Sequence, residues 1–214
     1  NYNLLNAALT KASAQSRRPP FNFIFHYVGS WHVPITADQY APADTFLREQ
    51  VAGVVGLPSL GLTRYVSTDN LQLYPASDKI VRSQRLDLVK LAFGSGIFDH
   101  IQVVEGQIPS PSDAGPAGTE SAPIEVLVSL ALANDVGLQV GQAYQLYKPA
   151  AGGDAPYLQP VRVSGIWVPL DATPQDDDFW AFYAPASFDK KLLIPESTFF
   201  GPVAASLPLP VNEA

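Results

Sequence analysis

The side chains that most often carry enzyme chemistry at neutral pH are scarce in this sequence. It has three histidines, His26, His32 and His100, and no cysteine. The lack of cysteine excludes a disulfide, a thiolate nucleophile and a cysteine-ligated zinc ion. A catalytic or metal-binding histidine needs partner groups at fixed geometry, and the residues around these three indicate none. We therefore expect the histidines to have packing or surface roles.

Carboxylates are concentrated in one segment, which runs from Asp171 to Asp176, Asp177 and Asp178. Carboxylate oxygens are the ligands that hard cations such as Ca²⁺ prefer. The segment lacks the glycine and the closing glutamate that the loop of an EF-hand places at its sixth and twelfth positions. The pattern therefore predicts an exposed, solvated loop without a bound metal.

Nucleotide and nucleophile motifs are absent as well. No Gly-Lys pair occurs, so there is no P-loop, and the turn Gly94-Ser95-Gly96 lacks the third glycine of a dinucleotide-binding loop. The sequence contains neither a G-x-S-x-G nucleophile elbow nor an H-E-x-x-H metal motif. We expect no catalytic residues, no cofactor and no metal.

Aromatic side chains are the remaining candidates for a binding role. The chain has 3 Trp, 9 Tyr and 11 Phe, and aromatic residues mostly fill protein cores. Trp31 and Tyr157 fall in segments that we predict to be loops. We therefore predict that these two are the exposed interaction residues, and that most of the other aromatic side chains are buried. Those considered with them as a possible sugar or peptide platform are Tyr27, Trp167, Trp180 and Tyr183.

Charge and hydropathy restrict the class of protein. The 214 residues are 47% apolar and carry a formal net charge of −7, divided as +2 over residues 1–100 and −9 over residues 101–214. An acidic chain is poorly suited to binding a phosphate backbone, so we expect no nucleic-acid partner. No apolar run approaches the roughly 20 residues of a membrane-spanning helix. Because the chain contains no Met, we expect it to be a piece of a longer protein.

The first third of the chain alternates helical and extended patterns. Apolar residues at helical spacing predict a helix over 2–15, and aromatic residues at every second position predict a strand over 21–28. A second helix is expected over 44–55, with Asp44 as its N-cap. A strand around 62–67 completes a strand–helix–strand unit.

The rest of the chain reads mainly as strands. A short helix at 129–135 is the exception, and Gly137 just beyond it suits the left-handed residue that ends many helices. Residues 142–147 and 161–168 alternate with period two and predict a hairpin. Further extended segments are expected at 83–93, 101–104, 124–128, 179–183 and 192–194.

These elements predict an α+β fold of two subdomains. The first, residues 1–84, holds the N-terminal helix and a strand–helix–strand unit. The second, residues 85–200, is β-rich, and residues 201–214 form a proline-rich C-terminal segment.

One region also carries a family resemblance. An apolar strand ends in Ser129, the following helix ends in Gly137-Leu138, Gly141 opens the next strand, and a later strand contains the Val-Ser-Gly-Ile of residues 163–166. In this order and spacing, together with the glycine turn at 103–109, the chain resembles the MacB-like periplasmic core domain of FtsX-like ABC transporter permeases. The resemblance covers about residues 85–200 and reaches residues 1–84 only in outline. The strand–helix–strand that usually closes the family's domain is replaced here by the proline-rich end.

The resemblance implies a location and a set of partners. Such a domain lies at the extracytoplasmic face of the cell membrane, between two membrane helices of an integral membrane permease. The implied partners are those helices, an ATP-binding subunit or domain on the cytoplasmic side, and a second copy of the permease. The implied role is non-enzymatic, and consists in transmitting conformational change or engaging a transported substrate or a partner protein. The porter-like strand–helix–strand subdomain and the β-rich subdomain are the corresponding fold.

Two other functions remain open from the residues alone. One is a free-standing extracellular module that binds glycans or peptides through Trp31 and Tyr157. The other is a hydrolase that uses paired carboxylates, which a sequence cannot pair. Apolar segments of roughly 20 residues on both sides of this chain in its parent protein favour the permease.

Overall fold

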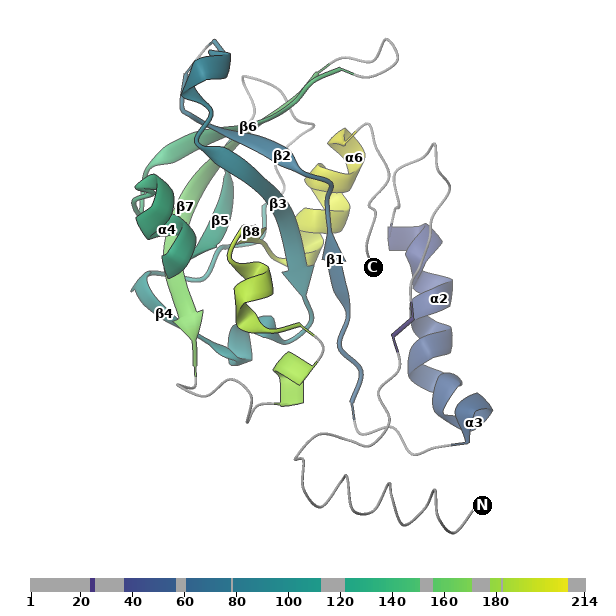
Figure 1. Ribbon diagram of the computed structural model, residues 1–214. Coiled ribbons are helices and arrows are strands. Elements are labelled where there is room, and N and C mark those ends of the chain that lie inside the picture. Colours follow the sequence, from purple (N-terminus) through teal and green to yellow (C-terminus); the bar gives the residue numbers. More distant parts are fainter. Residues whose placement is uncertain are drawn as a thin grey trace, which may run out of the picture.

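The fold is described from a computed structural model, which confirms the α+β class: the described residues form helices and a mixed sheet (Figure 1). The predicted helix 2–15, Trp31, His26, His32 and most of the predicted strand 21–28 lie outside the described residues, as does most of the acidic segment. The structure describes residues 24–25, 37–56, 61–77, 79–112, 122–150, 156–170, 178–181 and 183–207.

The strands in the described residues form one sheet that is closed on itself. They are β1 (Tyr65–Ser67), β2 (Leu71–Pro75), β3 (Asp87–Gly94), β4 (Ile101–Gly106), β5 (Ile124–Ser129), β6 (Ala143–Lys148), β7 (Tyr157–Pro169) and β8 (Lys191–Leu193). They pair in the order β1-β3-β2-β6-β7-β5-β8, and β8 also pairs with β3. The six strands β3, β2, β6, β7, β5 and β8 therefore form a ring, which we call the barrel. The other two strands lie outside the ring: β1 pairs with β3, and β4 pairs with β7.

Helical segments precede the barrel, interrupt it and follow it. The α-helices of the described residues are α2 (Ala37–Glu49), α3 (Val51–Val55), α4 (Leu130–Val136), α5 (Glu196–Thr198) and α6 (Ala204–Ser206). The 3-10 turns are η1 (Arg82–Gln84), η2 (Ile97–Asp99), η4 (Asp178–Ala181) and η5 (Pro185–Phe188), and the π-type turn is η6 (Phe199–Val203). Figure 1 shows α2 and α3 beside the barrel rather than within it. We call residues 37–56 the arm.

The hairpin predicted from residues 142–147 and 161–168 is present as the antiparallel pair β6–β7, but β6 pairs with residues 157–162, and most of 161–168 pairs with β4 and β5 instead. β7 also has a bulge next to Gly165, because Val126 of β5 lies opposite Val163 whereas Leu127 lies opposite Gly165. Gly165 allows β4 to approach closely, since a side chain there would begin 2.7 Å from the carbonyl oxygen of Gln107.

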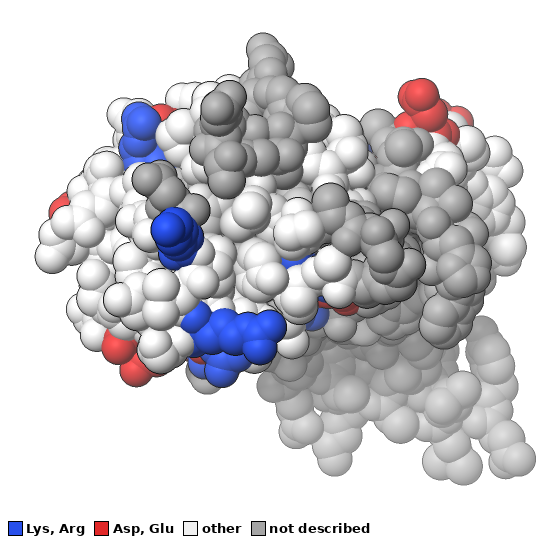
Figure 2. Space-filling view, turned by 90° about the horizontal axis from the view of Figure 1, so that it is seen from above, with Lys and Arg blue, Asp and Glu red and all other residues white. Residues whose placement is uncertain are grey.

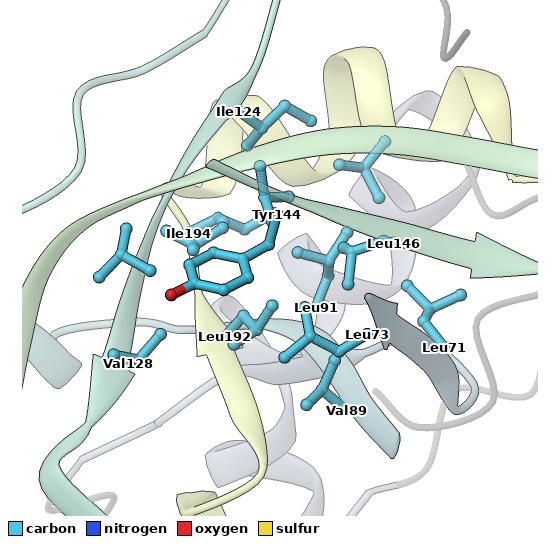
Figure 3. Packing of buried hydrophobic residues seen from close by; sticks show 14 of the residues in the cluster. Leu71, Leu73, Val89, Leu91, Ile124, Val128, Tyr144, Leu146, Leu192 and Ile194 are labelled. Carbon is cyan, nitrogen blue, oxygen red and sulfur yellow. The ribbon is translucent and has the colours of Figure 1, made fainter. Parts of the chain in front are cut away.

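The barrel interior holds the main hydrophobic core. Alternate residues of the ring strands point inward and are buried, and α4 and residues 199–207 complete the cluster. Figure 3 shows part of it, including Leu71, Leu73, Val89, Leu91, Ile124, Val128, Tyr144, Leu146, Leu192 and Ile194. A second cluster includes the intervening residues Ala92, Leu127, Trp167 and Leu193, together with Trp180 and Phe188.

The short helix predicted at 129–135 is confirmed, displaced by one residue, as α4. The hydroxyl of Ser129 accepts a hydrogen bond from the backbone N–H of Leu132 at 3.0 Å, which caps α4. Gly137 ends the helix with a φ of 74° in the left-handed region. The strand predicted at 192–194 is confirmed, displaced by one residue, as β8.

Three local predictions were wrong. Asp44 is not an N-cap, because α2 begins at Ala37 and places Asp44 in its interior. The described part of 179–183 is a 3-10 turn and not a strand. Tyr157 is not in a loop, since it opens β7 opposite Lys148 and is 3% exposed. The described residues also show β1 and β2, from the first predicted subdomain, paired in the same sheet as β3.

Candidate functional site

The predicted binding residues do not form a surface platform among the described residues. The prediction that Tyr157 is exposed is wrong, and Trp167 and Trp180 are buried with parallel rings 6.4 Å apart. His100 stacks on Phe179 with ring centroids 4.1 Å apart. The aromatic residues that the structure describes therefore serve mainly to pack the barrel.

The described residues also lack two other kinds of site. They contain no group of three or more His, Cys, Asp or Glu side chains that could hold a metal ion. No helix in the described part is long and apolar enough to cross a membrane.

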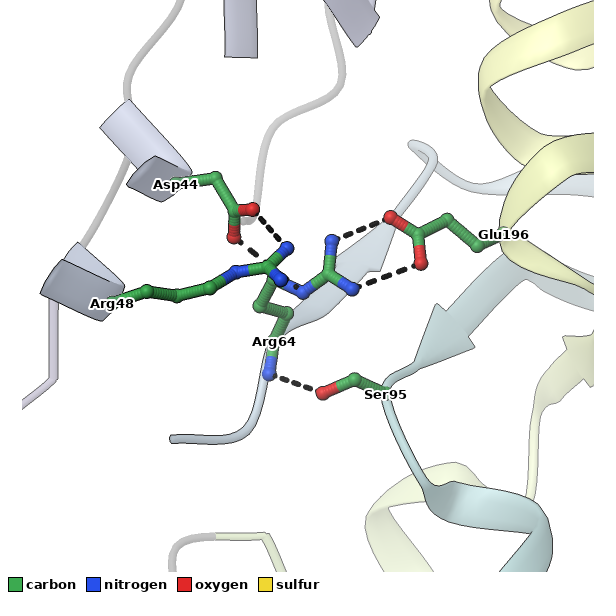
Figure 4. Close-up of polar contacts among 5 residues, drawn as sticks. All are labelled: Asp44, Arg48, Arg64, Ser95 and Glu196. Atoms are coloured by element: carbon green, nitrogen blue, oxygen red, sulfur yellow. Dashed lines mark hydrogen bonds and ion pairs between the residues drawn. The ribbon is translucent and has the colours of Figure 1, made fainter. Parts of the chain in front are cut away.

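The most developed polar site lies where the arm meets the barrel. It consists of Asp44 and Arg48 from α2, Arg64 just before β1, Ser95 just after β3, and Glu196 at the start of α5 (Figure 4). We call these five residues the Arg64 cluster. Segments far apart in the sequence meet here, since Arg64 and Glu196 are 132 residues apart.

Arg64 is the centre of the cluster. Its guanidinium donates two hydrogen bonds to the carboxylate of Glu196, one of them from Nη2 to Oε2 at 2.9 Å. Its Nε lies 3.5 Å from Oδ1 of Asp44, whose other oxygen accepts a hydrogen bond from Arg48. A bidentate arginine–carboxylate pair is stronger and more directional than a single ion pair. Arg64 therefore joins α2 to α5 through one planar group.

The backbone holds Arg64 in position. Its N–H donates to the hydroxyl of Ser95 at 2.8 Å, and its carbonyl accepts from the N–H of Ser95 at 2.8 Å. These two bonds tie the residue before β1 to the turn that follows β3. The guanidinium is thus fixed at the edge of the barrel, and the arm docks against it.

An aromatic contact lies beside these ion pairs on the same face of α2. Tyr40, four residues before Asp44, is buried, and its ring stacks on Phe200 with centroids 5.6 Å apart. Phe200 in turn contacts Phe93 of β3 and Phe199, each with centroids 5.5 to 5.6 Å apart. Burial, followed by the negative charge of Asp44, raises the pKa of Tyr40. The arm therefore docks through an apolar and an ionic contact placed one helical turn apart.

Exposure divides the cluster into an inner and an outer part. The side chains of Arg64 and Asp44 are 16% and 11% exposed, whereas those of Arg48 and Glu196 are 52% and 43% exposed. Ion pairs that are shielded from water and geometrically fixed contribute more than surface pairs. Oδ1 of Asp44 is buried and has no hydrogen-bond partner among the described residues, so its contact with Arg64 is an ion pair only, whereas Glu196 accepts hydrogen bonds from Arg64.

The contacts of the cluster join separate elements of the fold. Its charged groups neutralise one another in pairs, Arg64 with Asp44 and Glu196, and Arg48 with Asp44. What it does is link two bodies through directional bonds. The sequence analysis missed this site, although Tyr40, Asp44 and Arg48 at four-residue spacing were a signal that one helical face is involved.

A scan against models of protein families found no matching family, and a search of curated proteins found no relative.

Proposed function

We propose that this chain is an extracytoplasmic domain of an ABC transporter permease of the FtsX-like class, similar to the MacB-like periplasmic core domain. It acts without catalysis and transmits conformational change between the membrane helices of the permease and a substrate or partner protein. ATP hydrolysis takes place on a separate cytoplasmic subunit or domain. The order of the strand, helix and glycine motifs over residues 103–166 supports this assignment.

The observation that carries the proposal is the pairing of a closed barrel with an arm that docks through a small, directional joint. A domain that transmits motion needs a stiff body and a defined connection to the part that moves. The barrel supplies stiffness because its strands pair in a ring and its interior is filled. The Arg64 cluster and Tyr40 supply the connection.

The position of the arm in the chain gives the direction of transmission. Residues 37–56 precede all the strands of the barrel that the structure describes. A displacement that enters from a membrane helix before residue 1 therefore reaches α2 first along the chain. It passes to the barrel through Arg64, which contacts α2 through Asp44 and α5 through Glu196.

A spin-label experiment on the complete transporter tests this role. Because the chain has no cysteine, one label is introduced with Gln102→Cys on β4 and another in the preceding membrane helix. We expect the distance between the labels to change on ATP binding in the otherwise unmodified protein. Arg64→Ala should reduce that change, while Arg162→Ala, which removes a cation from an exposed position on β7, should not.

Two outcomes contradict the proposal. One is a parent protein without membrane helices on either side of this chain, which favours the free-standing binding module. The other is a barrel label that keeps its distance in all nucleotide states, or that moves equally with and without Arg64. Loss of folding in the Arg64→Ala variant is detected separately by circular dichroism of the purified chain.

A further inference from the structure

The turn between β2 and β3 carries three basic side chains that the described charges do not neutralise. Lys79, Arg82 and Arg85 are all exposed. Arg48, Arg64, Lys148 and Lys190 each lie within ion-pair distance of a carboxylate. No carboxylate in the described part of the chain pairs with the three side chains of the turn. We call residues 76–86 the basic turn.

Backbone hydrogen bonds hold residues 81–86 of the basic turn. The N–H of Gln84 donates to the carbonyl of Val81 at 2.8 Å, and the N–H of Leu86 donates to the carbonyl of Leu73 at 2.8 Å. Arg82 begins the 3-10 turn η1 and Arg85 directly follows it. The N–H of Arg85 donates to the carbonyl of Arg82 at 3.5 Å, so a backbone hydrogen bond joins the two arginine residues.

The charge of this turn differs from that of the whole chain. Asp78 is the one acidic residue in its sequence, so residues 76–86 carry a formal charge of +2 (three basic minus one acidic) in a chain of net charge −7. Asp87, which follows, is engaged by Lys190 at 2.9 Å. Val81 adds an apolar side chain that is 44% exposed between the basic ones. Figure 2, which views the molecule from above, shows separate groups of Lys and Arg side chains spread over the left half and the lower margin of this face, with Asp and Glu side chains at its rim.

An ordered turn with exposed cations around an apolar side chain matches the chemistry of an anionic lipid surface. Each Lys or Arg side chain that contacts anionic headgroups raises the partition coefficient of the protein onto the membrane about fivefold. Three such side chains together therefore raise it roughly a hundredfold. At physiological salt that is too little to hold a free protein at a membrane, although the attraction is stronger at low salt, where the screening length is greater. The same attraction is sufficient for a domain that is already anchored beside a membrane, because the anchor gives the domain a high effective concentration at the membrane surface.

We infer that the basic turn contacts the anionic headgroups of the membrane in which the parent permease is embedded. That the domain is attached to a membrane protein rests on the proposed function. That it contacts headgroups rests on the exposed cations of the basic turn. Figure 1 places the turn and α6 at the same end of the molecule. Under the proposed function, the chain runs from α6 toward the following membrane helix, so this end of the barrel is within reach of the bilayer.

Vesicle binding by the purified chain tests the headgroup contact without depending on transport. Sedimentation is measured at low salt with vesicles of phosphatidylglycerol and phosphatidylcholine mixed in equal parts, and with phosphatidylcholine alone. We expect binding only to the anionic vesicles, and a decrease as salt shortens the screening length from about 30 Å at 0.01 M to about 8 Å at 0.15 M. Replacing Lys79, Arg82 and Arg85 together by Gln should lower the partition coefficient roughly a hundredfold.

A matched pair of single variants separates the turn from net charge. Arg85→Gln and Arg162→Gln each remove one exposed cation, and only the first should weaken binding, by about fivefold. Equal effects, or equal binding to uncharged vesicles, overturn the inference. The inference is also overturned if about 10 mM glycerol phosphate abolishes vesicle binding, because a free phosphate ester at that concentration cannot compete with a multivalent lipid surface.

A further binding measurement uses soluble poly-glutamate in place of vesicles. Binding to poly-glutamate with no binding to anionic vesicles overturns the lipid contact in favour of an acidic protein segment. Failure of the vesicle experiment leaves the spin-label result on the Arg64 joint unaffected, so the two proposals fail separately.

Discussion

The barrel and the arm are stabilised in different ways. The strands of the barrel pair in a closed ring around a buried interior, and residues such as Leu71, Val89 and Leu91 have no exposed surface. In the arm, Tyr40 and Asp44 are the buried side chains among those described, while Val54 of α3 is 73% exposed. The barrel is thus stabilised by many apolar contacts, and the arm by a few contacts on one face of α2.

This difference separates stability from coupling. Damage to the barrel core should unfold the whole domain, because every ring strand depends on its neighbours. Damage to the joint should release the arm and leave the barrel folded. Changes inside the barrel should therefore have larger effects on the free energy of unfolding than changes at the joint.

The largest effect is expected at Gly106, where β4 crosses the bulge of β7. Gly106 has a φ of 76°, and a Cβ there would lie 2.2 Å from the carbonyl oxygen of Ser164. Gly106→Ala should lower the free energy of unfolding by about 4 kcal/mol, through left-handed strain and backbone displacement together. Urea denaturation measures it.

Gly96 provides the matched control, since it has the same φ of 76° and nothing within 4 Å of the added Cβ. Gly96→Ala should lower the free energy of unfolding by only about 1 kcal/mol. If the two variants lose equal free energy of unfolding, the loss comes from left-handed backbone strain alone. The displacement of β4 from β7 would then cost nothing.

Core truncation in β3 should have the next largest effect. Leu91 is fully buried in the barrel interior, whereas Leu88, on the same strand, is 38% exposed. Leu91→Ala should lower the free energy of unfolding by about 3 kcal/mol, and Leu88→Ala by less than about 1 kcal/mol. Thermal denaturation followed by circular dichroism compares them. Similar losses contradict a core confined to the inside of the ring.

The arm should respond to Arg64→Ala in a different manner. The change leaves the carboxylate of Asp44 buried with only Arg48 as its partner, and because the site is intermediate between surface and core we expect a loss of about 2 kcal/mol. Hydrogen exchange should accelerate in α2 and remain slow in β3 and β7.

Arg64→Lys and Arg162→Ala are the controls for this change. Lysine keeps the charge but not the bidentate geometry, so its loss should be intermediate. Arg162→Ala should have little effect on exchange in either region. Uniform acceleration across the barrel in Arg64→Ala contradicts a separable arm.

Local patterns predicted the elements whose causes are local. Ser129 and Gly137 delimit α4, and period-two alternation identified β6 and β7, because a cap or an alternation is encoded within a few residues. Tyr157 was misplaced because neighbouring prolines and glycines indicated a loop, although its pairing with Lys148 continues β7.

Long-range contacts could not be predicted in the same way. Asp44 was interpreted as an N-cap because aspartate is favoured there, whereas it pairs with Arg48 on the same helix and with Arg64 from the segment beyond α3. The closure of the ring depends on β8 reaching β3, and the joint depends on Glu196 reaching Arg64. These contacts join residues that are far apart in the sequence and depend on the topology of the whole fold, so no local spacing of residues predicts them.

The smallest effect is expected at Tyr157, where the barrel core contains a hydroxyl without a hydrogen-bond partner among the described residues. A buried, unpaired hydroxyl gives the folded state no compensation for its lost hydration. Tyr157→Phe should therefore change the free energy of unfolding at pH 7 by less than about 0.5 kcal/mol, or raise it slightly. A loss of about 2 kcal/mol instead would show that the hydroxyl is bonded in the core.

The same substitution should alter the response to alkaline pH. Burial raises the pKa of Tyr157 above its ordinary value, so the folded state keeps the phenolic proton at a pH where the unfolded chain has lost it. The stability linked to this group is present in full below about pH 10 and declines as the pH rises toward the folded pKa. Unfolding measured from about pH 8 to 11 should thus show a steeper loss for the wild type than for Tyr157→Phe. Parallel curves would place the hydroxyl in contact with water, and the barrel would then be less closed at β7 than its strand pairing indicates.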